Sequence, residues 1–163
     1  MSLEWIVITL MWCVGVISVV VCPKQHLRKL LFTMLLCQAL TWVTTLIHVY
    51  YGLLSFPVRE FPKATDLLVT TEYFFYPLIC GYYVVYEPSR HVGARMAYLA
   101  LWVTGLTTID IVIERYTDLI EYIHYSWYWT WIVFFGLFAI TNISCQQFFK
   151  SRALFRGEKE VTE

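Results

Sequence analysis

The sequence predicts an all-α fold, a polytopic membrane bundle of five transmembrane helices, and three observations predict it. Hydrophobic residues make up 59% of the 163 residues, charged residues only 15%, and the mean hydropathy is +0.60. A soluble domain of this length needs a more polar surface. Apolar segments are long enough to cross about 30 Å of hydrocarbon as helices, and basic residues gather on alternate connections. The lipid bilayer is therefore the expected partner of most of the protein surface.

The predicted helices cover nearly the whole chain. We place them at residues 4–22, 30–54, 67–86, 96–115 and 122–148. Each is expected to be helical because backbone polar groups that face lipid need hydrogen-bond partners within their own segment. Pro77 and Gly81 predict a kink inside the third helix. Residues 1–150 thus form a single membrane domain, and residues 151–163 form a charged cytoplasmic tail that frays.

The basic residues predict the orientation of the bundle. One set of connections carries nine of the twelve: Lys24, Arg28, Lys29, Arg90, Arg95, Lys150, Arg152, Arg156 and Lys159. The opposite side carries Arg59, Lys63 and Arg115. Because lysine and arginine concentrate on the cytoplasmic side, the N-terminus is predicted outside and the C-terminus in the cytoplasm. A formal net charge of zero offers no basic field for nucleic acid. Five helices make a thin bundle, which leaves open a homodimer or a partner membrane protein.

The cysteines are predicted to be free. Their spacing contains no C-x-x-C pair, and the five are Cys13, Cys22, Cys37, Cys80 and Cys145. Free cysteine behaves as a small apolar residue when it is buried. We therefore expect neither a disulfide framework nor a thiolate metal site.

Ionisable residues gather in the outer half of the predicted bundle. His48, Glu72 and Asp110 each lie five or six residues from the outer end of a helix, roughly 8–9 Å below the boundary. Glu114 and His124 lie closer to the surface. An acid that faces lipid at such depth costs on the order of 2–3 kcal/mol, so these five side chains should face one another in an outward-facing chamber. The inner half of the helices is expected to hold no ionisable residue.

Three functions fit such a chamber. With Arg59 or Arg115 as counter-ion, it would bind a proton, a cation or a small headgroup in a binding, accessory or transport-related role. Glu121 and His124 have the i, i+3 spacing with which one helix gives a carboxylate and an imidazole to a metal, which would make a metal-dependent membrane enzyme acting on a lipid or envelope precursor. A structural scaffold held by interhelical hydrogen bonds uses the same residues. The sequence assigns no cofactor.

Two further segments allow alternatives. Residues 55–66 repeat a Phe-Pro pair around Arg59-Glu60, and proline favours extended geometry, so we expect an ordered flap; a solvated connector is the alternative. An aromatic run follows the outer turn: Tyr122, Tyr125, Trp127, Tyr128, Trp129 and Trp131. It is either an interfacial belt or a chamber wall that binds a cationic or sugar-like headgroup.

Four stretches carry a resemblance to a known family: PKQHLRK, FPVREFPKAT, EYFFYPLIC and ERYTDLIEYIHYSWYWTW. Over residues 4–150 the chain resembles an uncharacterised family of small multi-pass membrane proteins from spore-forming Firmicutes. The tryptophan-rich block is the most specific part. The resemblance implies an all-helical protein of the bacterial cytoplasmic membrane in a sporulation or envelope context. It carries over no catalytic residue.

Overall fold

The computed structural model describes residues 3–88, 91–123 and 126–160, with side chains up to residue 150. Its described part holds five α-helices, a short π-helix and one pair of two-residue strands. In chain order these are α1 (Leu3–Val21), α2 (Lys24–Tyr50), β1 (Leu54–Ser55), η1 (Thr70–Phe75), α3 (Tyr76–Val85), α4 (Val92–Tyr116), β2 (Glu121–Tyr122) and α5 (Trp127–Glu160). The predicted all-helical fold is confirmed.

Four helices are long and apolar enough to cross a membrane: α1, α2, α4 and the Trp127–Lys150 part of α5. The chain therefore has the helices of a membrane protein. The remaining helix is shorter, because six residues of η1 and ten of α3 together give only about 24 Å of length. Most of α3 is buried between the other helices. Its role as a fifth span stays a prediction.

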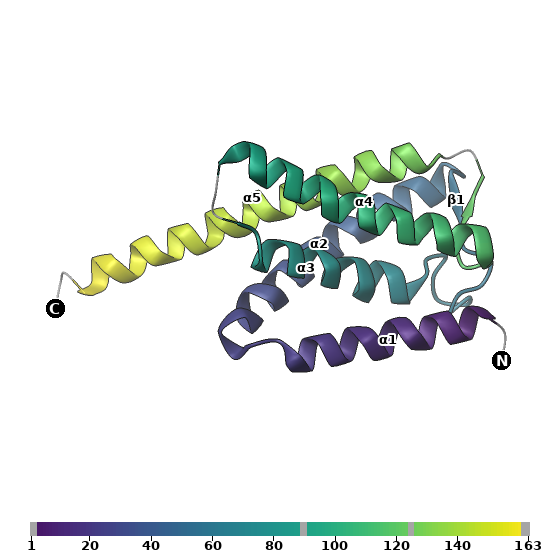
Figure 1. Ribbon diagram of the computed structural model, residues 1–163. Helices are drawn as coiled ribbons and strands as arrows, with labels where there is room; N and C mark the ends of the chain where they lie inside the picture. The colour runs from purple at the N-terminus through teal and green to yellow at the C-terminus, as the bar shows by residue number, and fades with distance from the viewer. Residues whose placement is uncertain (1–2, 89–90, 124–125, 161–163) are drawn as a thin grey trace.

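Successive helices run in opposite directions, as Figure 1 shows. The N-terminus and β1 lie at one end of the bundle, which we call the strand end. The turn between α3 and α4 lies at the other end, from which α5 projects toward the C-terminus; we call this the tail end. The predicted outer side corresponds to the strand end. Since the two termini lie at opposite ends, the arrangement agrees with an odd number of crossings.

Several predicted boundaries are wrong. The second helix ends at Tyr50 rather than at residue 54, and the fifth begins at Trp127 rather than at residue 122, because residues 54–55 and 121–122 pair as strands. The basic turn before residue 30 is already helical in α2, because Pro23 starts the helix and its carbonyl accepts the His26 and Leu27 backbone N–H groups. At the other end, α5 continues through the predicted tail to Glu160 instead of ending near residue 148. Residues 151–160 contain no proline and several strong helix formers, which continue the helix through the single weak helix former, Gly157.

The predicted irregularity in the third helix takes the form of a π-turn. The backbone N–H of Tyr76 donates to the carbonyl of Thr71, five residues earlier. Pro77 follows directly; a proline lacks an N–H group and crowds the preceding turn, which a wider turn relieves. Gly81 has a different role: a Cβ there would lie 2.7 Å from Leu30 Cδ1. Its missing side chain lets α3 pack closely against α2.

The core has two parts. One fills the bundle interior around α3 and contains Cys37, Tyr76, Cys80, Tyr83, Val84, Leu99, Val103, Leu106, Phe134, Leu137, Phe138 and Cys145. The other closes the strand end and contains Ile8, Met11, Phe56, Leu67, Leu68, Ile113, Leu119 and Ile120. The second group includes residues of both loops at that end, the one after β1 and the one between α4 and β2. Residues 54–69 therefore form a packed flap, held by the pairing of Leu54 with Tyr122 and Ser55 with Glu121 and by the Val58 N–H on the Asp118 carbonyl.

Candidate functional site

A cavity of about 40 Å³ lies under the strand end, and we call it the chamber. Helices α2, α3, α4 and α5 and the π-helix η1 form its walls, and the two strands and the flap cover it. Its lining residues are Thr41, Thr44, Thr45, His48, Leu54, Phe56, Glu72, Tyr76, Asp110, Ile120, Tyr122, Thr130, Val133, Phe134 and Leu137. A cavity of this size has room for a few water-sized groups.

Three of the five residues predicted for this layer line the chamber. They are His48 from α2, Glu72 from η1 and Asp110 from α4. Glu72 and Asp110 are each only 4% exposed. The depth of these residues along their helices therefore predicted correctly that two acids and a histidine from three separate segments lie close together.

Neutral hydroxyl groups hold both carboxyl groups in place. The Thr45 hydroxyl donates to Glu72 Oε2 at 2.8 Å, and the Thr41 hydroxyl donates to the backbone carbonyl of Glu72 at 3.1 Å. The Tyr76 hydroxyl donates to Asp110 Oδ1 at 2.5 Å. Each carboxyl oxygen has room for further donors, because a carboxylate accepts up to about four hydrogen bonds. These hydroxyl groups orient the acids but do not neutralise them.

The imidazole of His48 has a defined tautomer. Its Nδ1 lies 2.7 Å from the backbone carbonyl of Thr44. A carbonyl oxygen only accepts hydrogen bonds, so Nδ1 carries the proton. The ring lines the chamber, so it belongs to the same polar environment as the two acids.

The predicted counter-ions are wrong. Arg59 forms an ion pair with Asp66 at 3.0 Å and donates to the Phe56 carbonyl at 3.0 Å, so it holds the flap. Arg115 is exposed at the end of α4. Neither lines the chamber, and its lining includes no lysine or arginine. The acids are thus buried without the basic partner that the sequence suggested.

The other predicted residues lie elsewhere. Glu114 lines a separate groove beside α5, one turn beyond Asp110 on α4. Glu121 lies in strand β2, exposed, with the Ser55 hydroxyl donating to it at 3.4 Å. His124 lies outside the described residues. Because Glu121 is in a strand, the predicted helical pair of Glu121 and His124 does not form. In the described ranges, no three His, Cys, Asp or Glu side chains are grouped to hold a metal ion.

The sequence analysis missed the hydroxyl groups of the chamber. Thr41, Thr45 and His48 lie at i, i+4 and i+7 on α2, and Tyr76 follows Glu72 by four residues. On a helix such spacings place side chains on one face. The spacing alone is not specific, because threonine commonly makes helix contacts in membrane helices.

Glu60 in the flap was also missed. Its carboxylate accepts the backbone N–H groups of Val69 at 3.0 Å and Thr70 at 2.9 Å, and also the Thr70 hydroxyl. The free N–H groups at the start of a helix need such a partner. The Trp12 indole N–H donates to the same Thr70 hydroxyl at 2.8 Å. Glu60 thereby fixes the segment that carries Glu72, from a sequence distance that no local pattern reveals.

At the tail end, ionisable residues lie around the turn between α3 and α4, as the sequence predicted for Arg95. Glu87 forms a two-pronged ion pair with Arg95 at 2.9 and 3.3 Å. It also accepts hydrogen bonds from Asn142 at 2.7 Å and Gln146 at 2.8 Å, and Asn142 donates to the Tyr83 hydroxyl. This network joins α3, α4 and α5. Its hydrogen bonds and ion pair hold these three helices together, and we call this network the structural lock.

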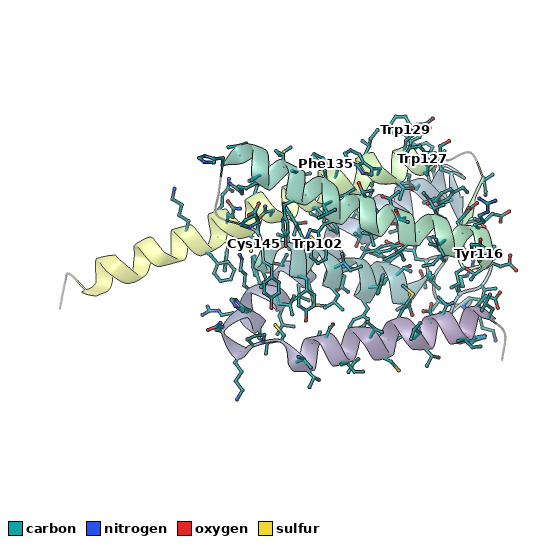
Figure 2. The ribbon with its side chains drawn as sticks, in the orientation of Figure 1. Trp102, Tyr116, Trp127, Trp129, Phe135 and Cys145 are labelled. Atoms are coloured by element: carbon teal, nitrogen blue, oxygen red, sulfur yellow. The ribbon has the colours of Figure 1, made fainter. Side chains whose placement is uncertain are left out.

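The aromatic run divides between the chamber and the protein surface, so both predicted roles stay predictions. Tyr122 lines the chamber and accepts a hydrogen bond from the Thr130 hydroxyl at 3.1 Å. Trp127, Tyr128 and Trp129 are exposed, and Figure 2 shows both tryptophans at the start of α5. Trp131 is half-buried and donates to the Thr104 hydroxyl at 3.0 Å. Tyr125 lies outside the described residues.

The chamber therefore combines two buried carboxyl groups, an imidazole and hydroxyl donors under a packed flap. Such a set can take up a proton or hold a small cation through oxygen atoms. Comparison with protein-family models, with curated proteins and with solved structures finds no match to this chain.

Proposed function

We propose that this protein is an integral membrane protein whose chamber binds a proton or a small monovalent cation. The observation that carries the proposal is that Glu72 and Asp110 line one small cavity, each 4% exposed, with no lysine or arginine in the lining. Removing two carboxylates from water costs several kcal/mol per ion unless positive charge accompanies them. Even a charged His48 would balance only one of the two.

The size of the chamber selects among the ligands that the sequence left open. About 40 Å³ is enough for a few water-sized groups but not for a phospholipid headgroup. The oxygen donors come from side chains on α2, η1 and α4. A bare cation or a proton therefore fits, and a headgroup does not.

The setting of the chamber is part of the proposal. With η1 and α3 as the fifth crossing, the strand end faces outward and the C-terminus lies in the cytoplasm, as the basic residues predict. The membrane would be the bacterial cytoplasmic membrane, and the sporulation or envelope context implied by the resemblance stays a prediction. The chamber would then exchange its ligand with the outside, through or beside the flap.

Infrared difference spectroscopy of the purified protein in detergent tests the proposal. The C=O stretch of a protonated carboxyl group is recorded while sodium or potassium chloride replaces N-methylglucamine chloride, and separately while the pH is lowered. A bound cation or proton changes the band of the chamber acids. We expect Glu72→Gln and Asp110→Asn each to remove part of that change.

The matched control is Asp118→Asn, which removes an exposed carboxylate at the same end of the bundle. It should leave the cation-induced and acid-induced changes as they are in the unmodified protein. If neither cations nor acid changes the band, or if both chamber variants give the unmodified spectrum while eluting as folded protein, the chamber is structural and the proposal fails.

A further inference from the structure

We propose a second site, independent of the chamber, in which a groove between the end of α4 and the start of α5 binds the ammonium group of a phospholipid headgroup. The groove has a volume of about 340 Å³, far larger than the chamber. Its lining residues are Ile111, Glu114, Tyr122, Ser126, Trp127 and Tyr128. Among them is Glu114, the acid that the sequence predicted for the chamber but that lines this groove instead.

The carboxylate of Glu114 supplies the negative charge. Its side chain is half-buried, and within residues 3–88, 91–123 and 126–160 no hydrogen bond or ion pair engages it. The neighbouring Arg115 is exposed and does not line the groove. A half-buried acid that pairs with no basic side chain in the described part of the chain favours a cationic ligand, because the ligand's charge offsets the loss of hydration.

Two aromatic rings supply the cage. Trp127 and Tyr128 both line the groove, with ring centroids 6.1 Å apart and nearly perpendicular ring planes at 82° to each other. Ammonium ions bind against aromatic faces, and aromatic cages with a nearby acid recognise alkylated amines. The two rings are 58% and 48% exposed, so a ligand reaches them without unfolding.

The position of the groove points to a lipid. It lies where α4 ends and α5 begins, at the strand end, among exposed tryptophan and tyrosine side chains of the kind that settle at the level of lipid headgroups. Figure 2 places Tyr116, Trp127 and Trp129 at this end. A headgroup amine of a surrounding phospholipid is therefore the cation that we propose for the groove.

Tyr122 lies between the groove and the chamber, because it is a lining residue of both. A headgroup in the groove would contact the same ring whose hydroxyl accepts the Thr130 hydrogen bond. The lipid would thus cover one wall of the chamber. The groove proposal nevertheless stands on its own residues, and loss of cation binding in the chamber would leave it unaffected.

Native mass spectrometry in maltoside detergent tests the site. Phosphatidylethanolamine and phosphatidylglycerol with identical acyl chains are offered together, and the bound fractions are compared. We expect a preference for phosphatidylethanolamine of about tenfold, as an ion pair and cation–π contact together provide. Tetramethylammonium chloride should abolish the preference, whereas sodium chloride at the same ionic strength should preserve most of it.

Two variants and one control complete the experiment. Glu114→Gln removes the charge at nearly constant shape, and Tyr128→Leu removes one wall at an exposed position; each should reduce the preference about fivefold or more. Asp118→Asn removes a negative charge at the same end and should keep it. Equal binding of the two lipids by the unmodified protein would overturn the proposal, as would an unchanged preference in both groove variants.

Discussion

The contact between Glu60 and the start of η1 gives the sharpest stability prediction. Replacing Glu60 by alanine removes the acceptor of the Val69 and Thr70 backbone N–H groups and of the Thr70 hydroxyl. Thr70 is fully buried, so its N–H group cannot turn to water. An unsatisfied buried donor costs about 1–3 kcal/mol, and hydrogen bonds to a charged acceptor are the stronger ones.

Two such backbone groups lower the expected free energy of unfolding by about 3 kcal/mol. For a chain of this length, that corresponds to a fall of roughly 6–12 °C in the unfolding midpoint. The Trp12 indole still donates to the Thr70 hydroxyl, so the hydroxyl keeps one partner and its loss adds little. The estimate therefore rests on the two N–H groups alone.

The cysteines provide the assay. Cys22, Cys37, Cys80 and Cys145 are buried and free, whereas Cys13 is exposed. In a Cys13→Ser background, a thiol-reactive fluorescent dye reports the temperature at which the buried thiols become accessible. The dye signal then measures unfolding of the bundle in detergent through the protein's own cysteines.

The control for this experiment is Lys63→Ala, an exposed position of the same flap. It shortens a charged side chain near Glu60 without removing a described hydrogen bond. If the Glu60→Ala midpoint lies within about 2 °C of this control, the Glu60 cap contributes nothing to stability and the reasoning from its hydrogen bonds is refuted.

Three further predictions concern the packing of α3, the Glu87 ion pair and the orientation of the bundle, and the first two use the same dye assay. Gly81→Ala should lower the midpoint because its Cβ meets α2, at a cost of about 1–3 kcal/mol, while Gly105→Ala, with nothing within 4 Å, should not lower it; equal midpoints would contradict the close packing. Glu87→Gln should cost about 1–2 kcal/mol in the same dye assay by weakening its ion pair, and an unchanged midpoint would argue against a structural lock. A membrane-impermeant thiol reagent on intact cells should label Lys63→Cys and spare His91→Cys; the reverse pattern would invert the proposed orientation.

The predicted helices agree with the structure for a simple physical reason. Hydrocarbon offers no hydrogen-bond partner, so a long apolar segment of a membrane protein satisfies its backbone as a helix. Depth along such helices then placed His48, Glu72 and Asp110 in one layer, because antiparallel helices keep their ends roughly level. The ends of helices are less predictable. The first residues of α2 are basic rather than apolar, so the sequence predicts a loop where the structure has a helix.

The charge partners could not be predicted from spacing. Arg59 binds Asp66 because the flap folds back on itself, and Glu60 reaches Val69 and Thr70 across the same fold. Glu114 shares a helix face with Asp110, yet one additional turn carries it past the edge of the chamber. These outcomes depend on where the flap and strands close the bundle, which is a property of long-range packing.

The sequence by itself determined the helical architecture, the membrane character and the end of the bundle that holds the buried acids. Each follows from the free energy of moving apolar and polar groups between water and hydrocarbon, which is nearly local in the chain. The tertiary structure alone decided that Glu72 and Asp110 share one small cavity without a basic residue, while Glu114 lines an aromatic groove beside it. Those assignments require contacts between α2, η1, α4 and α5, because the partner of a buried charge is chosen by distance in space.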